Sequence, residues 1–69
     1  MVGITASLAR NIKKYRLLVG ISQDKLSKAA NVTLHAITKI ESGATLDPRV
    51  KTIKKIADAL GRTVDELLK

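Results

Sequence analysis

Apolar residues near the start of the chain recur every three or four positions, the spacing of one face of an α-helix. Gly20 follows this run, at a place where helices commonly end on a left-handed residue. The pattern predicts an amphipathic helix over residues 5–18 with Gly20 as its C-cap. The apolar stripe expected to face the core consists of Leu8, Ile12, Tyr15 and Val19.

Two short helices joined by a tight turn are predicted next. Ser22 is typical of an N-cap and opens the first of them, and Thr33 opens the second in the same way. Between them, Asn31 stands where the turn needs a left-handed residue, a conformation that asparagine tolerates better than most side chains. Gly43 marks the end of the second helix. Together they predict a helix-turn-helix at approximately residues 22–42, a pattern that other helical hairpins share.

The last third of the chain predicts two more helices. Pro48, with Asp47 before it, suits the start of the first, which Gly61 ends. Thr63 is the expected N-cap of a short final helix over residues 64–68. The residues expected to be buried are Val50, Ile53, Ile56, Ala57 and Leu60 in the longer helix and Leu67 in the final one.

The composition favours one all-α domain. A chain of 69 residues can build one hydrophobic core and is too short for two, so we expect a single domain over residues 1–69. Its apolar residues are almost all aliphatic and Tyr15 is the only aromatic one, which argues against a β-sandwich. A domain this small leaves much of its apolar surface in water, and a second subunit would cover some of it. We therefore expect a five-helix, all-α fold and a homodimer.

The charge of the chain is high and unevenly placed. The formal net charge is +7, and residues 1–57 carry eleven basic side chains against three acidic ones. Such an excess indicates a polyanionic partner, with nucleic acid ahead of an anionic membrane. The alternative is an ordinary soluble surface with scattered lysines. Because no stretch has the length and hydropathy of a membrane span or a signal peptide, we expect a soluble, cytoplasmic protein with no membrane partner.

The third predicted helix, residues 33–42, has two different faces. At about 100° per residue, its apolar positions and one glutamate fall on the side that faces the core. The other side carries mostly short polar groups, which can lie against base edges without filling the major groove of double-stranded DNA. The inward set is Thr33, Ile37, Ile40 and Glu41, the outward set is His35, Thr38, Lys39 and Ser42, and Leu34 and Ala36 lie at the borders.

Each outward position suggests a contact with DNA. Lys39 can donate to guanine O6 or N7, His35 and Thr38 can bond a base edge or a phosphate, and Leu34 can cover a thymine methyl group. The alternatives are that His35 and Lys39 are merely exposed and that Leu34 belongs to the core. Gln23, at the start of the second helix, suits a phosphate, or is a plain first-turn residue. The candidate DNA-contacting residues are Gln23, Thr33, Leu34, His35, Thr38, Lys39 and Ser42, with Ala44 and Thr45 as further backbone contacts.

Glu41 is unexpected on the inward face of a helix. An isolated carboxylate is costly to remove from water, so it requires a cationic partner. Arg16 borders the apolar stripe of the first helix, and a guanidinium can hold a carboxylate through two parallel bonds. We therefore predict a structural ion pair between Arg16 and Glu41, the alternative being an exposed Glu41 at the helix end.

Several motifs occur together along the chain and in a consistent order. They are GISQDKL at residues 20–26, NVT at 31–33, ITKIESG at 37–43, IADALG at 56–61 and VDELL at 64–68. This set resembles the Cro/C1-type, or Xre-family, helix-turn-helix transcriptional regulators over nearly the whole chain. The resemblance implies a five-helix, lambda-repressor-like fold, operator binding as a homodimer and repression of transcription. It also implies DNA contacts at the positions of Gln23, Leu34, His35, Thr38, Lys39 and Ser42 and a buried ion pair at those of Arg16 and Glu41.

Other function classes fit the sequence less well. The alternative reading is a protein-interaction module of the same fold, such as an antitoxin, a coactivator or a controller protein. An enzyme is not expected, because His35 has no acidic neighbour at a useful helical spacing and there is no cysteine. For the same reasons we expect no cofactor, no metal site and no small-molecule ligand. A single tyrosine, predicted to be in the core, is a poor stacking platform for single strands or RNA.

Overall fold

The computed structural model describes residues 4–44 and 48–69. Within these ranges every regular element is a helix, which confirms the prediction of an all-α fold with five helices. The pattern-based helix boundaries agree with the structure to within a residue or two, because caps and apolar periodicity are local signals. The helices are α1 (Ile4–Val19), α2 (Gln23–Ala30), α3 (Leu34–Ser42), α4 (Val50–Leu60) and α5 (Val64–Leu68).

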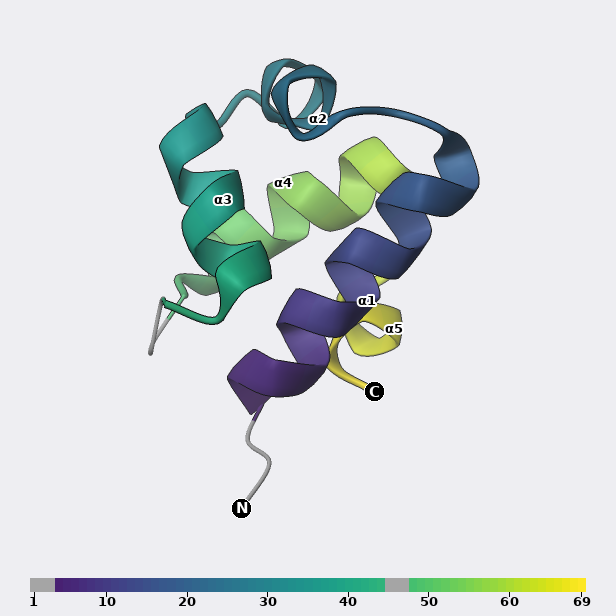
Figure 1. The fold of residues 1–69 in the computed structure, drawn as a ribbon. Helices are drawn as coiled ribbons and strands as arrows, with labels where there is room; N and C mark the ends of the chain where they lie inside the picture. The colour runs from purple at the N-terminus through teal and green to yellow at the C-terminus, as the bar shows by residue number, and fades with distance from the viewer. Residues whose placement is uncertain (1–3, 45–47) are drawn as a thin grey trace.

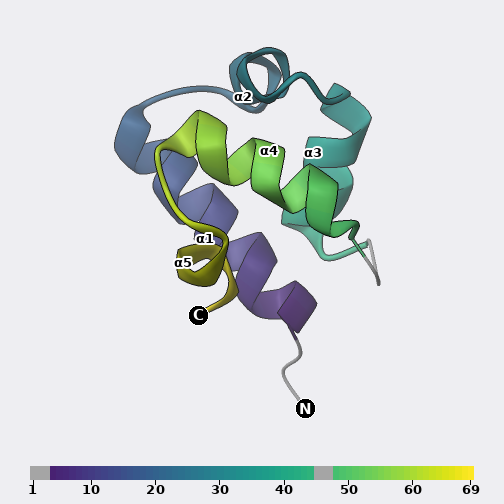
Figure 2. The same ribbon diagram turned by 180° about the vertical axis from the view of Figure 1, so that it is seen from behind.

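The helices pack around one aliphatic core. In Figure 1, α1 crosses the front of the molecule and α3 lies to its left. The helix α2 lies at the top, and α4 runs behind α1 from α3 towards the upper end of α1. Figure 2, from behind, shows α4 running across the bundle and α5 lying against α1. Because α3 packs mainly on α1 and α2, its other side faces outward. The largest fully buried side chains are Leu8, Ile12, Leu26, Ile37, Ile56 and Leu67.

Local capping explains where the two short helices begin and end. The Ser22 hydroxyl accepts the backbone N–H of Lys25 at 3.1 Å, and the Thr33 hydroxyl accepts that of Ala36 at 3.1 Å, so both predicted N-caps are confirmed. Asn31 has a φ of 56°, the left-handed conformation predicted for the turn between them. These contacts set the direction in which α3 leaves α2.

The prediction of burial in the core is wrong for two residues. Val19 is 54% exposed and Val50 is 72% exposed, although both fall on the apolar side of their helices by periodicity. Val19 is the last residue of α1 and Val50 the first of α4. Periodicity gives the angle of a side chain around the helix, whereas burial also requires a neighbour at the same height along the axis.

The start of α4 also differs from the prediction. Pro48 was expected to begin this helix, but the helix begins at Val50 and Arg49 is its N-cap, without a side-chain capping bond. A proline can precede a helix as well as begin one, because its fixed φ suits both positions. Asp47, which completed the predicted start, lies outside the described residues.

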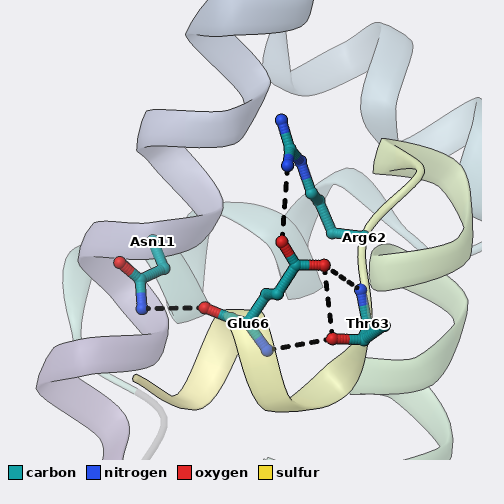
Figure 3. Close-up of polar contacts among 4 residues, drawn as sticks. All are labelled: Asn11, Arg62, Thr63 and Glu66. Carbon is teal, nitrogen blue, oxygen red and sulfur yellow. Dashed lines mark hydrogen bonds and ion pairs between the residues drawn. The ribbon is translucent and has the colours of Figure 1, made fainter.

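A polar contact that sequence reasoning missed holds α5 against α1. The buried side-chain amide of Asn11 donates to the carbonyl oxygen of Leu67 at 2.9 Å. It also donates to that of Glu66 at 3.3 Å (Figure 3). The last carbonyls of a helix lack partners within the helix, so Asn11 satisfies two of them. The signal in the sequence was a polar residue beside Leu8 and Ile12 on the apolar stripe of α1.

The start of α5 is closed by a capping box between Thr63 and Glu66. The Thr63 hydroxyl accepts the Glu66 N–H at 3.1 Å, and the Glu66 carboxylate accepts the Thr63 N–H at 3.0 Å (Figure 3). Arg62 adds an ion pair with Glu66 at 3.3 Å and places its guanidinium 4.5 Å from the centre of the Tyr15 ring. The backbone N–H of Thr63, and then Arg62, lower the pKa of Glu66 below its ordinary value of 4.5, and partial desolvation opposes them.

This capping box predicts a pH-dependent contribution of Glu66 to stability. Because its pKa is lower in the folded protein, ionised Glu66 stabilises the fold above pH 4.5, and this contribution is lost as the pH falls through the lowered pKa. Melting temperatures measured at several pH values should show wild type above Glu66→Gln at neutral pH and the two converging in acid. Glutamine keeps an oxygen for the Thr63 N–H, so the difference reports the charge. A gap that stays constant down to pH values well below 4.5 would contradict this assignment.

Candidate nucleic-acid interface

The two sides of α3 differ in burial as well as in chemistry. Ile37 and Ile40 face the core, with exposed fractions of 0% and 5%. On the opposite side His35, Lys39 and Ser42 are exposed, and Thr38 is half-buried between them. Residues three and four apart on a helix are neighbours on its surface, so these four side chains form one continuous strip. We call the strip of His35, Thr38, Lys39 and Ser42 the outer face of α3.

An ion pair fixes the angle of α3 about its own axis. The Arg16 guanidinium donates from Nε to Glu41 Oε2 at 2.8 Å and from Nη2 to Glu41 Oε1 at 3.1 Å. Both side chains are largely buried, with exposed fractions of 11% and 5%. The remaining Nη1 donates to the carbonyl of Ile21 at 2.9 Å, a contact that the sequence did not suggest. Arg16 therefore joins α1, the turn before α2, and α3 in one network.

The same ion pair changes the charge that α3 presents to solvent. Glu41 is the only acidic residue of this helix, and its carboxylate points inward to Arg16. The outer face of α3 consequently carries an ammonium, an imidazole and two hydroxyls but no carboxylate. A surface of this kind can approach a polyanion without like-charge repulsion.

The hydroxyls around α3 divide into two classes by their hydrogen bonds. Thr38 donates to the carbonyl of His35 at 2.9 Å and Ser42 donates to that of Lys39 at 3.0 Å, so both can meet a partner only as acceptors. The Ser42 oxygen also accepts the Ala44 N–H at 3.3 Å and keeps one further lone pair for a partner. The N-cap hydroxyls of Ser22 and Thr33 instead accept backbone N–H groups, which leaves their own hydrogens free to donate. Acceptors suit the amino groups of bases, and donors suit phosphates.

Other candidate residues surround this face. Leu34 is 42% exposed, so it is not the buried core residue that the sequence left as an alternative. Gln23 is the first residue of α2 and is half-buried, and Ala44 is exposed just after α3. Thr45 lies outside the described residues. Ser22, which sequence reasoning treated only as a cap, joins the candidates because its free O–H stands next to Gln23.

Comparison with known families decides the identity of this motif. The family model for helix-turn-helix domains, HTH_3, matches residues 12–67 of the 69. The chain belongs to the Cro/C1-type helix-turn-helix family. This family consists of DNA-binding domains, so the protein is a DNA-binding helix-turn-helix regulator. Searches of curated proteins and of solved structures found no match.

Across residues 4–44 and 48–69, no helix of this helix-turn-helix protein is both long and apolar enough to cross a bilayer.

The Arg16–Glu41 pair should contribute strongly to the stability of this helix-turn-helix protein. We expect Arg16→Ala to lower the free energy of unfolding by about 3–5 kcal/mol, because it leaves a buried carboxylate without a partner. The double variant Arg16→Met/Glu41→Leu should recover most of that loss, since the uncompensated charge is gone. Chemical denaturation followed by circular dichroism measures both changes.

An exposed ion pair supplies the matched control. Lys28 and Asp24 lie 3.2 Å apart in side chains that are 78% and 58% exposed. Lys28→Ala should therefore cost less than about 1 kcal/mol. A denaturation midpoint that Arg16→Ala leaves unchanged would refute the structural role of the buried pair.

Proposed function

We propose that this protein binds specific sequences of double-stranded DNA and represses transcription, with α3 inserted in the major groove. The observation that carries this proposal is the outer face of α3, which is free of carboxylates because Glu41 turns inward. Its side chains are short enough to let the helix backbone approach the base edges. The net charge of +7 adds attraction to the phosphates at any sequence.

Within this proposal, each side chain of the interface has a chemical role. Lys39 donates to guanine O6 or N7, and Leu34 covers a thymine methyl group. Thr38, whose hydrogen is bonded to His35, accepts from adenine N6 or cytosine N4. His35 completes the reading face with an imidazole that reaches a base edge or a phosphate.

Backbone contacts come from the residues that flank the two helices. Ser22 and Thr33 donate their free hydroxyl hydrogens to phosphates, and Gln23 places its amide beside the N-terminus of α2. These phosphate contacts set the register of α3 in the groove and carry no sequence information themselves. Ser42 differs from them, because its oxygen is an acceptor and extends the base-reading outer face towards the end of α3.

Binding as a homodimer follows from the small size of the reading surface. A single α3 has nine residues and reaches only a few base pairs, too few to distinguish one site from the many competitors in a genome. Two copies on an inverted repeat would double the contacts. A dimer placed over a promoter represses by excluding polymerase, and in a cell without a nucleus this takes place in the cytoplasm.

Selection from random duplexes, followed by titration of the selected site at several salt concentrations, tests the proposal. We expect an inverted repeat with half-sites about one helical turn, ~34 Å, apart. Affinity should fall steeply with salt, and the selected site should bind about a thousandfold or more tighter than random duplex. Equal affinity for selected and random duplexes at every salt concentration would contradict sequence-specific binding.

Lys39 offers a direct test of base reading. Lys39→Ala should cost about 1–3 kcal/mol on the selected site and relax the preference at one base pair. Lys55→Ala, an exposed lysine of α4, is the matched control for charge and should weaken selected and random duplexes alike and only slightly. If Lys39→Ala weakens both duplexes equally, Lys39 contacts a phosphate instead of a base.

A further inference from the structure

The C-terminal end of α1 carries an exposed apolar cluster that the DNA-binding function does not use. Leu17 and Leu18 point about 100° apart around α1 and are 59% and 67% exposed, whereas Val19, 54% exposed, lies on the side of the apolar stripe. A single exposed leucine is ordinary, but two large exposed leucines side by side on a small domain indicate an interaction site. These side chains therefore require an explanation other than the core.

The charged residues of α1 next to this cluster are all positive. Lys13 lies one helical turn before Leu17, and Lys14 lies one turn before Leu18, so each leucine has a lysine as its surface neighbour. Both lysines are exposed, and α1 contains no acidic residue. On the Lys14 side the surface continues over the Tyr15 ring, whose centre lies 5.5 Å from the Lys14 ammonium. The two leucines therefore have basic neighbours on their N-terminal side.

DNA does not suit this cluster. In both views the C-terminal end of α1 and the helix α3 lie at opposite sides of the molecule (Figures 1 and 2). The phosphate backbone would satisfy the lysines, but it offers no apolar group to cover Leu17 and Leu18. A partner on this cluster would leave the outer face of α3 free.

A second copy of the chain does not suit it either. Two copies meeting through this cluster would bring the lysines of both together, and like charges oppose association. Within residues 4–44 and 48–69, only Asp65 among the carboxylates is outside an ion pair with a cation of the same subunit. The paired carboxylates are Asp24 with Lys28, Glu41 with Arg16, Asp58 with Lys54, and Glu66 with Arg62.

We propose that the α1 docking face, defined as Lys13, Lys14, Leu17 and Leu18, binds an amphipathic helix of another protein. That helix has apolar side chains along one stripe and carboxylates beside them, which complement the leucines and the lysines respectively. Because none of the four residues belongs to the outer face of α3, this docking is separate from the reading of DNA and permits both at once.

A designed peptide serves as the probe. It is a helix of about five turns with a leucine stripe flanked by glutamates, and its matched control has lysines in place of the glutamates. Fluorescence anisotropy with the full chain should detect binding of the acidic peptide and not of the basic one. Amide chemical-shift changes should be concentrated in residues 13–19.

Two variants of the protein locate the site. Leu17→Ser/Leu18→Ser should weaken binding of the acidic peptide about tenfold or more, because the apolar contacts are lost. Lys13→Glu/Lys14→Glu should exchange the preference, so that the basic peptide binds and the acidic one does not. Leu34→Ser, which alters the exposed leucine of α3, is the control and should leave peptide affinity unchanged. All the substituted positions are exposed, and circular dichroism verifies that the variants remain helical.

Three outcomes would overturn the proposal. Equal binding of the two peptides would remove the role of charge. Loss of self-association in Leu17→Ser/Leu18→Ser, measured by sedimentation, would assign the face to a second copy. Loss of binding to phosphatidylglycerol vesicles in the same variant, without peptide binding by wild type, would assign it to a membrane. Since duplex binding is measured separately, failure of the DNA-binding proposal and failure of this one are distinguishable.

Discussion

The buried contact between Arg16 and Glu41 is the interaction on which the arrangement of this protein depends. One guanidinium holds the carboxylate of α3 through two bonds and the carbonyl before α2 through a third. Its bonds reach both α3 and the turn before α2, so the relative placement of α1, α2 and α3 is set at one point. Because the pair is buried, loss of either partner would leave the other as a desolvated charge without a counter-ion.

This contact also connects stability with function. An aliphatic core of leucines and isoleucines can tolerate small rotations of a helix, since apolar contacts have no direction. A bidentate ion pair tolerates much less rotation of α3, because its two bonds are directional. It therefore keeps His35, Thr38 and Lys39 turned outward. It also keeps the only negative charge of α3 away from the outer face of that helix. The same two bonds thereby position the outer face of α3 and leave it compatible with a polyanion.

The surface of the bundle is divided between two kinds of chemistry. The outer face of α3 offers short polar groups with defined donors and acceptors, as base reading requires. The α1 docking face offers leucines beside lysines, as an acidic amphipathic helix requires. Their separation on opposite sides of a small bundle would allow a regulator to hold DNA and a second protein together, which unites the two functions that the sequence left as alternatives.

Local signals in the sequence were sufficient for the helices and their caps. Ser22, Asn31 and Thr33 act through bonds to residues at most a few positions away. Their roles can therefore be predicted from the sequence without knowledge of the tertiary fold. The inward side of α3 could also be predicted, because helical periodicity places Glu41 among apolar residues. A carboxylate in that position requires a cationic partner, which led to the prediction of Arg16 on α1.

Burial was the part that only the tertiary structure decided. Periodicity places Val19 and Val50 on apolar stripes, yet both are largely exposed at the ends of their helices. The anchoring of α5 by Asn11 joins residues more than fifty positions apart, and no local pattern encodes such a contact. The sequence thus determined which way each side chain turns about its own helix. The packing of the helices decided what each side chain meets, because that depends on distances between segments remote in the chain.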